Sequence, residues 1–329
     1  MGNPKWYSGF GLALAADAAD EPSAPTVFPI AESGKISIVP RMYERQVAFA
    51  ADVDHVVTTG FEYGFSLGNV QPDAETFGRI LWLALGSDGY AVGKHQIVPA
   101  ADAKYLNFFL DYQEDIGADQ VQRLIGAKIT GLSFEQPEQD IAKLNVSGAG
   151  LDLGTPLASL SPSIPTGDDN EPMGWKALQQ AGSFVELSLN GGAYAQDDSI
   201  QSFGFDYART AIPSGTGVGQ NQPTKLDNGI RNVSFKFTKE FYGASATAQV
   251  NAFLAQQRVG MKLRWEMGST PYYVELYIPN ANFSGDPLPA AGQEEDVLKL
   301  EFTAKAFRDG STPVIYAYVV DSTAAAYSD

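Results

Sequence analysis

The chain has 329 residues, which is enough for one large domain or two of ordinary size. Apolar residues make up 44% and charged residues 19%, a globular composition that excludes general disorder. Lys and Arg number 22 against 39 Asp and Glu, so the formal net charge is −17, and both halves of the chain are acidic. The acidic charge of both halves excludes a protein that binds nucleic acid through clustered basic side chains.

Several site classes are excluded by missing residue types. The chain has no cysteine, so disulfide scaffolds, cysteine-based zinc sites and thiol nucleophiles are ruled out. No apolar run approaches the ~18 residues needed to cross a bilayer. The N-terminal stretch resembles neither a secretory signal nor a myristoylation signal. We therefore expect a cytoplasmic protein without a membrane anchor.

Alternating apolar and polar residues dominate the chain and predict half-buried antiparallel strands. Gly, Pro, Asn and Asp separate these runs. The clearest alternation covers residues 61–67, 232–238 and 298–305, and similar runs occupy 36–48, 105–113, 120–134, 141–149, 184–190, 200–209, 261–267 and 272–284.

Two segments have helical spacing instead. Over residues 72–85, acidic residues suit the first turn and Gly86 suits a left-handed stop. Over residues 245–258, Ser245 can cap the start and Gly260 can end the helix. We expect the apolar stripes of both helices to be buried, namely Phe77, Ile80, Leu81 and Ala84 in the first and Val250, Phe253 and Leu254 in the second.

The order of these elements repeats along the chain. After each helix comes a strand pair, then the matched segments Ala127–Gly131 and Ala281–Gly285, then Ile141–Val146 and Val297–Phe302. The sequence therefore predicts two similar units. We expect long irregular stretches at 1–34, 86–104, 211–229 and 308–329, although the apolar run Pro313–Val320 within the last of them is strand-like and is expected to dock rather than fray. We also expect the following division: an N-terminal arm 1–30, a first β unit 31–150, a linker 151–182, a second β unit 183–310 and a C-terminal segment 311–329.

Candidate chemical motifs are weak. The Gly-rich stretch Gly215–Gly219 lacks the Lys-Ser/Thr of a phosphate-binding loop. The group Asp52, Asp54 and His55 has no second histidine near it and is typical of a polar hairpin tip. Trp82 and Trp265 are best interpreted as core or interface residues. We therefore expect no enzyme activity, no cofactor and no metal site, although the 39 acidic residues leave a glycosidase-type carboxylate pair open.

The order of elements resembles the phage tail tube protein family, which is also similar to type VI secretion tube proteins. The likeness covers roughly residues 30–310. It is carried by Gly60–Leu67 leading into the helix that ends at Leu85-Gly86, by Ala127–Gly131, by Pro279–Gly285 and by the closing strand Val297–Ala306. The resemblance implies a mainly β fold of tandem duplicated tail-tube β-sandwich or barrel units, each with one flanking α-helix.

The resemblance also implies a function and partners. It implies a virion protein of the phage tail that forms stacked six-fold rings, through which DNA passes without specific binding during ejection. Two units per chain favour a homotrimeric, pseudo-hexameric ring over a homohexamer. Tape measure, tail terminator and baseplate proteins are the further partners implied.

The predicted strands and loops nominate residues for two surfaces of such a tube. The polar faces of the strands nominate lumen candidates: Glu62, Ser66, Lys143, Asn145, Asn232, Ser234, Lys236, Lys299 and Glu301. Hairpin tips and chain ends nominate contacts between rings: Asp52, Asp54, His55, Gly215, Gly217, Gln220, Trp6, Tyr7, Ile315 and Tyr316.

Alternation alone leaves open that the polar faces point to outside solvent. Two other functions also remain open. One is a virion-associated or extracellular β-protein that binds or hydrolyses carbohydrate. The other is a baseplate component.

Overall fold

The computed structural model describes residues 7–22, 24–45, 55–70, 73–113, 120–137, 142–157, 184–215, 223–240, 243–266, 272–287 and 299–327. These residues form 17 strands and two helices. The mainly β class predicted from the alternation is confirmed, and all strand pairs are antiparallel.

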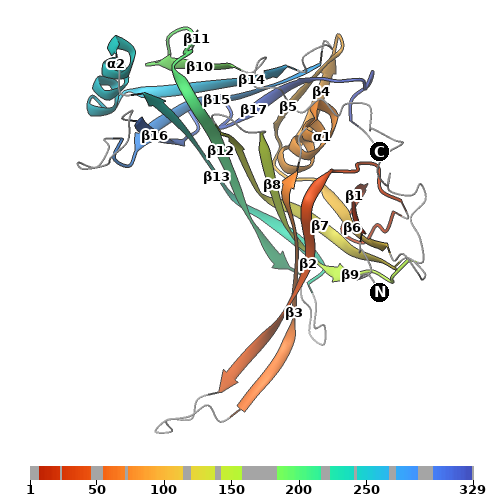
Figure 1. The fold of residues 1–329 in the computed structure, drawn as a ribbon. Coiled ribbons are helices and arrows are strands. Elements are labelled where there is room, and N and C mark those ends of the chain that lie inside the picture. The colour runs from red at the N-terminus through yellow and green to blue at the C-terminus, as the bar shows by residue number, and fades with distance from the viewer. Residues whose placement is uncertain are drawn as a thin grey trace, which may run out of the picture.

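The largest layer is a long antiparallel sheet, called here the main sheet, which runs through both halves of the chain (Figure 1). Within this sheet the halves are joined by the pairing of β12 with β7. The strands follow one another across the sheet in the order β2 (Ala31–Arg45), β3 (His55–Val70), β8 (Lys143–Gly150), β7 (Gln120–Gln136), β12 (Ile200–Ser214), β13 (Lys225–Glu240) and β16 (Lys299–Ala306).

Two further sheets complete the layers. The first consists of β1 (Tyr7–Ala15), β6 (Tyr105–Gln113), the beginning of β7 and β9 (Asp152–Leu153). The second follows the order β11 (Ala195–Gln196), β10 (Phe184–Leu189), β14 (Arg258–Glu266), β15 (Tyr273–Ser284), β17 (Tyr316–Val320), β5 (Lys94–Pro99) and β4 (Gly86–Ala91).

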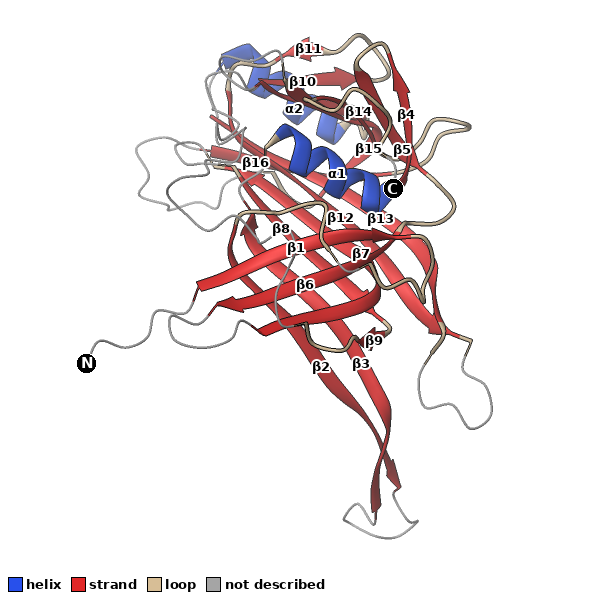
Figure 2. Ribbon diagram, turned by 90° about the vertical axis from the view of Figure 1, so that its right-hand side faces the viewer, coloured by secondary structure: helices blue, strands red, loops and turns tan. Residues whose placement is uncertain are grey.

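The two halves have the same order of paired strands. In the first half the order is β1-β6-β7-β8-β3-β2, and in the second it is β10-β14-β15-β16-β13-β12. In each half one helix lies in the connection from the strand at the fifth place of this order to the strand at the second place, and in the first half the β4–β5 hairpin follows the helix in that connection. The hairpin of β2 and β3 extends well beyond the body of the subunit (Figure 2).

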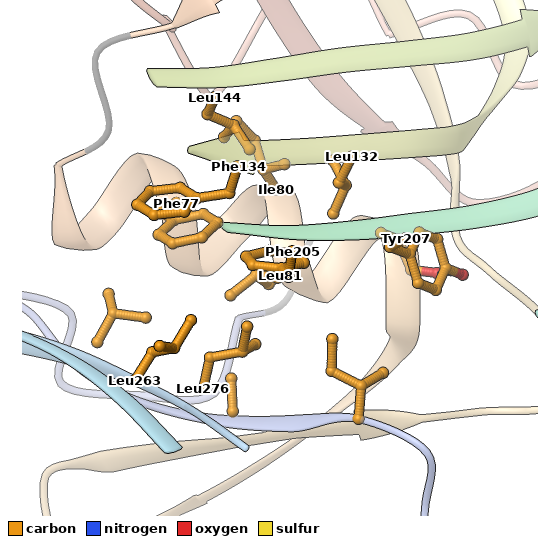
Figure 3. Close-up of a cluster of buried hydrophobic side chains, with 14 of the residues drawn as sticks. Phe77, Ile80, Leu81, Leu132, Phe134, Leu144, Phe205, Tyr207, Leu263 and Leu276 are labelled. Atoms are coloured by element: carbon orange, nitrogen blue, oxygen red, sulfur yellow. The ribbon is translucent and has the colours of Figure 1, made fainter. Parts of the chain in front are cut away.

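Helix α1 (Ala74–Leu85) lies between the layers and forms the centre of the core (Figure 3). Phe77, Ile80, Leu81 and Ala84 are all fully buried, as their spacing predicts. Asp73 is the N-cap and accepts a hydrogen bond from the backbone N–H of Thr76, so the helix begins at Ala74. Gly86 ends it with φ 102°, which confirms the predicted left-handed stop.

Helix α2 (Gly243–Leu254) corrects the sequence prediction at its C-terminal end. It stops at Leu254 rather than residue 258, because the following residues alternate and pair with β10 and β15 as strand β14. The prediction that its stripe is buried is wrong for Leu254, which is 70% exposed, and Val250 and Phe253 are only half-buried. The helix is attached by the buried Ala252, by Phe253 packed against Phe283, and by a polar contact in which the buried Gln249 accepts a hydrogen bond from Lys239 at 2.6 Å.

Three of the stretches expected to be irregular contain strands. Residues 86–104 hold the hairpin of β4 and β5, residues 1–34 hold β1, and residues 308–329 hold β17. The pairing that stabilises them is remote in sequence: β5 pairs with β17, and β1 pairs with β6. Local patterns carry no signal for such pairings, which is why the prediction failed for β1, β4 and β5. The strand-like run expected at Pro313–Val320 is confirmed by β17 and by the buried Ala317 and Val319. Among the described residues, neither helix is long and apolar enough to cross a membrane.

Candidate functional site

The feature that best suggests a function is the polar side of the main sheet. Successive side chains of a strand point to opposite faces. On one face the apolar residues, such as Phe65, Leu132 and Phe235, are buried against α1 and the other layers. The opposite face therefore consists of the intervening residues, which are mostly polar or small, with the exposed Val39 as an apolar exception. We call this surface the polar face.

The strand register aligns residues of the polar face in rows across both halves of the chain. One row is small and uncharged, and two further rows lie beside it. The first row runs Ser66, Ser147, Gly131, Ala208, Asn232; the second Asn145, Ser133, Asp206, Ser234, Lys305; and the third Lys143, Glu135, Gly204, Lys236, Thr303.

The candidates that the alternation nominated for the lumen are brought together here. Glu301 lies opposite Thr238, and Lys299 lies opposite Glu240, at the end of β16 and β13. Glu62 lies on β3, opposite Val39. All nine candidates therefore share the polar face, spread over the four strands β3, β8, β13 and β16: Glu62, Ser66, Lys143, Asn145, Asn232, Ser234, Lys236, Lys299 and Glu301.

Charges on the polar face are interleaved. Lys236 lies 3.2 Å from a carboxylate oxygen of Glu135, and Arg41 lies 2.9 Å from one of Glu62. All four side chains are at least a third exposed, so these pairs contribute little to stability. Their effect is to break up the local field, and in the described residues no basic stripe crosses the face.

Sequence reasoning missed further members of the polar face. Lys35, Asp206 and Lys305 are exposed there, and Glu135 lies in the third row. Asp206 and Lys305 fall in the predicted runs 200–209 and 298–305, and Lys35 and Glu135 lie one residue outside the predicted runs 36–48 and 120–134. Extending the same alternation over these runs and by one residue at their ends would have found all four.

The candidates for contacts between rings are mostly not in the described part of the chain. Asp52, Asp54, Gly217, Gln220 and Trp6 lie outside it. His55 and Tyr7 are the first residues of β3 and β1, and Gly215, with φ 78°, follows β12 and is exposed.

The remaining two candidates lie beside β17. Ile315 is fully buried and therefore packs within its own subunit. Tyr316 is half-buried, and its ring stacks on that of Tyr277 with 4.7 Å between ring centroids.

Two buried polar clusters lie away from the polar face. Lys239, at 0% exposure, donates to Asp197 at 2.6 Å as well as to Gln249. His95 is equally buried, with Nδ1 2.8 Å from Asp88 and Nε2 3.4 Å from Asp321. The first cluster attaches α2 to its sheet, and the second attaches the C-terminal segment to the β4–β5 hairpin. Nothing in the sequence pattern signalled either.

The described ranges hold no candidate metal centre. There, no three His, Asp or Glu side chains are grouped so that they could hold a metal ion. Trp82 and Trp265 are core residues, 5% and 0% exposed, so neither offers a ring to a carbohydrate. The acidic group at Asp52, Asp54 and His55 lies almost wholly outside the described residues.

The chain matches a known protein family. A family model for the phage tail tube protein matches residues 6–306, a range that includes every strand of the main sheet and both helices. No curated protein matches the chain in sequence.

Proposed function

Because the chain belongs to the phage tail tube protein family and is thus a structural component of the phage virion, we propose that it polymerises as stacked rings into a tube that conducts DNA during ejection. The observation that carries this proposal is the polar face, which continues across the β12–β7 junction without a basic stripe. A conduit must let phosphates slide past. Small polar groups and interleaved charges on a chain of net charge −17 satisfy that need.

We further propose that the chain arose by duplication and forms a trimeric, pseudo-hexameric ring. The identical pairing order of the two halves supports duplication, although the second half lacks a counterpart of the β4–β5 hairpin. The β12–β7 pair is then the junction between two units, formed within one chain. Three chains would supply six units, and edge strands would pair around the ring to close an inner barrel. A homohexamer is the alternative.

In this arrangement the polar face lines the bore, and the long hairpins reach the next ring. The β2–β3 hairpin projects beyond the body and carries the exposed apolar residues Val39 and Met42. Exposed apolar side chains on a projecting hairpin suit a contact with another subunit. The β12–β13 hairpin and the two ends of the chain are proposed to contribute to the same stacking.

The tube is proposed to assemble in the host cytoplasm and to meet tape measure, tail terminator or baseplate proteins at its interior and ends. DNA is not bound specifically.

Negative-stain microscopy of the purified chain, with mass measurement of isolated rings, tests the proposal. We expect open-ended tubes built from rings of three chains. Six chains per ring would contradict the trimer but not the tube. A closed particle without stacking would favour a baseplate component, and a monomer that binds polysaccharide would favour the carbohydrate-binding alternative.

A further inference from the structure

The two helices occupy the same place in their halves but differ sharply in burial. Both have 12 residues and end in leucine. Leu85, at the end of α1, is 0% exposed, whereas Leu254, at the end of α2, is 70% exposed. Figure 1 shows the reason: α1 lies inside the body, while α2 lies at its periphery.

The second half of the chain is what covers α1. The ring of Phe77 stacks on that of Phe205 in β12, with 6.5 Å between centroids, and meets the edge of Trp265 in β14 at 5.8 Å. The hydroxyl of Tyr207 in β12 donates to the carbonyl of Ala84 in the last turn of α1 at 3.1 Å. Among the described residues, α2 has no strand of another half laid across it in this way.

Strand β2 is the counterpart of β12 and is correspondingly uncovered. Each pairs with the strand that precedes the helix of its half. In the first half, Ile36 lies opposite Phe65, and Phe65 in turn lies opposite Gly148 in β8. In the second half, Phe205 lies opposite Phe235, and Phe235 in turn lies opposite Ala304 in β16. Gly148 and Ala304 stand five residues after the matched lysines that begin these two strands.

The correspondence assigns Ile36 to the place of Phe205, and therefore Ile38 to the place of Tyr207. Phe205 and Tyr207 are 0% and 1% exposed, while Ile36 is half-buried and Ile38 is 49% exposed. An apolar residue is thus exposed on β2 where its counterpart is covered by α1. Another is exposed at the end of α2, where its counterpart is buried. The two surfaces complement one another.

We propose that the exposed end of α2 packs against Ile36 and Ile38 of a second copy of the chain, repeating between chains the contact that α1 makes with β12 within one chain. The inference rests on the proposed self-assembly, and it names the contact that joins neighbouring chains of one ring. Burying Leu254 and Ile38 together removes two large apolar side chains from water, which favours association.

Cross-linking between differently marked chains tests this contact. The natural chain has no cysteine, so one chain can carry Ile38→Cys and another, of different mass, Leu254→Cys. After mixing and assembly, a short bifunctional maleimide is expected to join one chain of each kind. The matched control replaces Ile38→Cys by Val92→Cys, because Val92 is an exposed apolar residue on the β4–β5 turn, away from both surfaces. We expect no cross-link from position 92 to position 254.

Charge substitution provides the second measurement. Leu254→Lys is expected to abolish ring-sized species in sedimentation while leaving the unfolding midpoint of the isolated subunit unchanged, and Val92→Lys is expected to preserve both. Absence of the 38–254 cross-link overturns the inference. If tubes form in that same sample, the proposed function stands and only this contact is wrong; if none form, the proposed function fails as well.

Discussion

At the scale of single residues, the two helices give opposite expectations for equivalent changes. Ile80 is fully buried in α1, so Ile80→Ala is expected to lower the free energy of unfolding by about 2–5 kcal/mol through lost burial and a residual cavity. Leu254→Ala removes a side chain that is 70% exposed, so the isolated subunit should change by no more than about 0.5 kcal/mol. Urea unfolding of unassembled subunits measures both, and equal losses would contradict the burial described here.

Asp197 gives the subunit an acid-sensitive contact. Burial alone favours its neutral form, but hydrogen bonds from Lys239, Ser199 and Gln249 outweigh burial and lower the pKa to about 2. A carboxyl whose pKa is lower in the folded state stabilises the fold above its unfolded pKa, and that stability is lost as the pH falls. We therefore expect a loss of about 1–2 kcal/mol between pH 4 and pH 2, less than the full shift implies because the side chain is 12% exposed.

Two variants separate this contact from general acid sensitivity. Asp197→Asn leaves the buried Lys239 without its carboxylate, so stability should fall at neutral pH and the step between pH 4 and pH 2 should vanish. Asp198→Asn changes an exposed neighbour and should keep both the stability and the step. Thermal unfolding across this pH range decides between the outcomes, and an unchanged step in Asp197→Asn would exclude the assignment.

At the scale of elements, local pattern predicted strands and one helix well. Alternation found the strands of the main sheet, and apolar spacing with Gly86 found α1, because their burial follows from their own sequence. It failed for β1 and for the β4–β5 hairpin, because β1 pairs with the remote β6 and β5 with the remote β17. It also failed for the burial of Leu254, since a stripe shows which side of a helix is apolar but not whether anything covers it.

The polar face was also predicted only in part from the sequence. The polar face could be nominated strand by strand, because each polar residue follows from period two. The order of strands across the sheet could not, and it is this order that places Ser66 of the first half in one row with Asn232 of the second. Registers between remote strands depend on packing that no local pattern encodes.

The β12–β13 hairpin offers a prediction about stacking at the element scale. Leu226, near its end, is buried, accepts a hydrogen bond from Lys128 at 2.8 Å and donates its N–H to Tyr105 at 3.1 Å. A deletion that includes Leu226 would therefore damage the fold. Removing residues 216–222 alone spares these contacts, so we expect folded subunits that form rings but no longer stack. Sedimentation and microscopy measure this, and normal tubes from the deletion would contradict a stacking role.

At the scale of the whole molecule, chemical labelling can show which side of the main sheet faces the bore. Asn232→Cys places a thiol on the polar face, and Gln96→Cys places one at an exposed position of β5 in another sheet. A maleimide carrying a large polymer should react with both in free subunits. In assembled tubes it should still label position 96 but be excluded from position 232. Equal labelling of the two in tubes would place the polar face outside.

The charge of the bore is the last consequence, and it links single residues to DNA passage. The described charges of the polar face are mixed, and the chain is acidic as a whole, so a passing phosphate backbone meets no adhesive stripe. Changing Glu62 and Glu301 to Lys reverses two charges in every chain and sets a cation beside Arg41. Both acids are exposed, so assembly should survive. We expect DNA ejection to slow and the defect to ease as salt rises, because bound counterions compete with lysine for phosphate.

Asp198→Lys, which changes an exposed acid off this face, should leave ejection unchanged. Ejection rates measured on particles across a salt series separate the outcomes, and a salt-independent defect would show that the substitutions act on the structure rather than on the passing DNA.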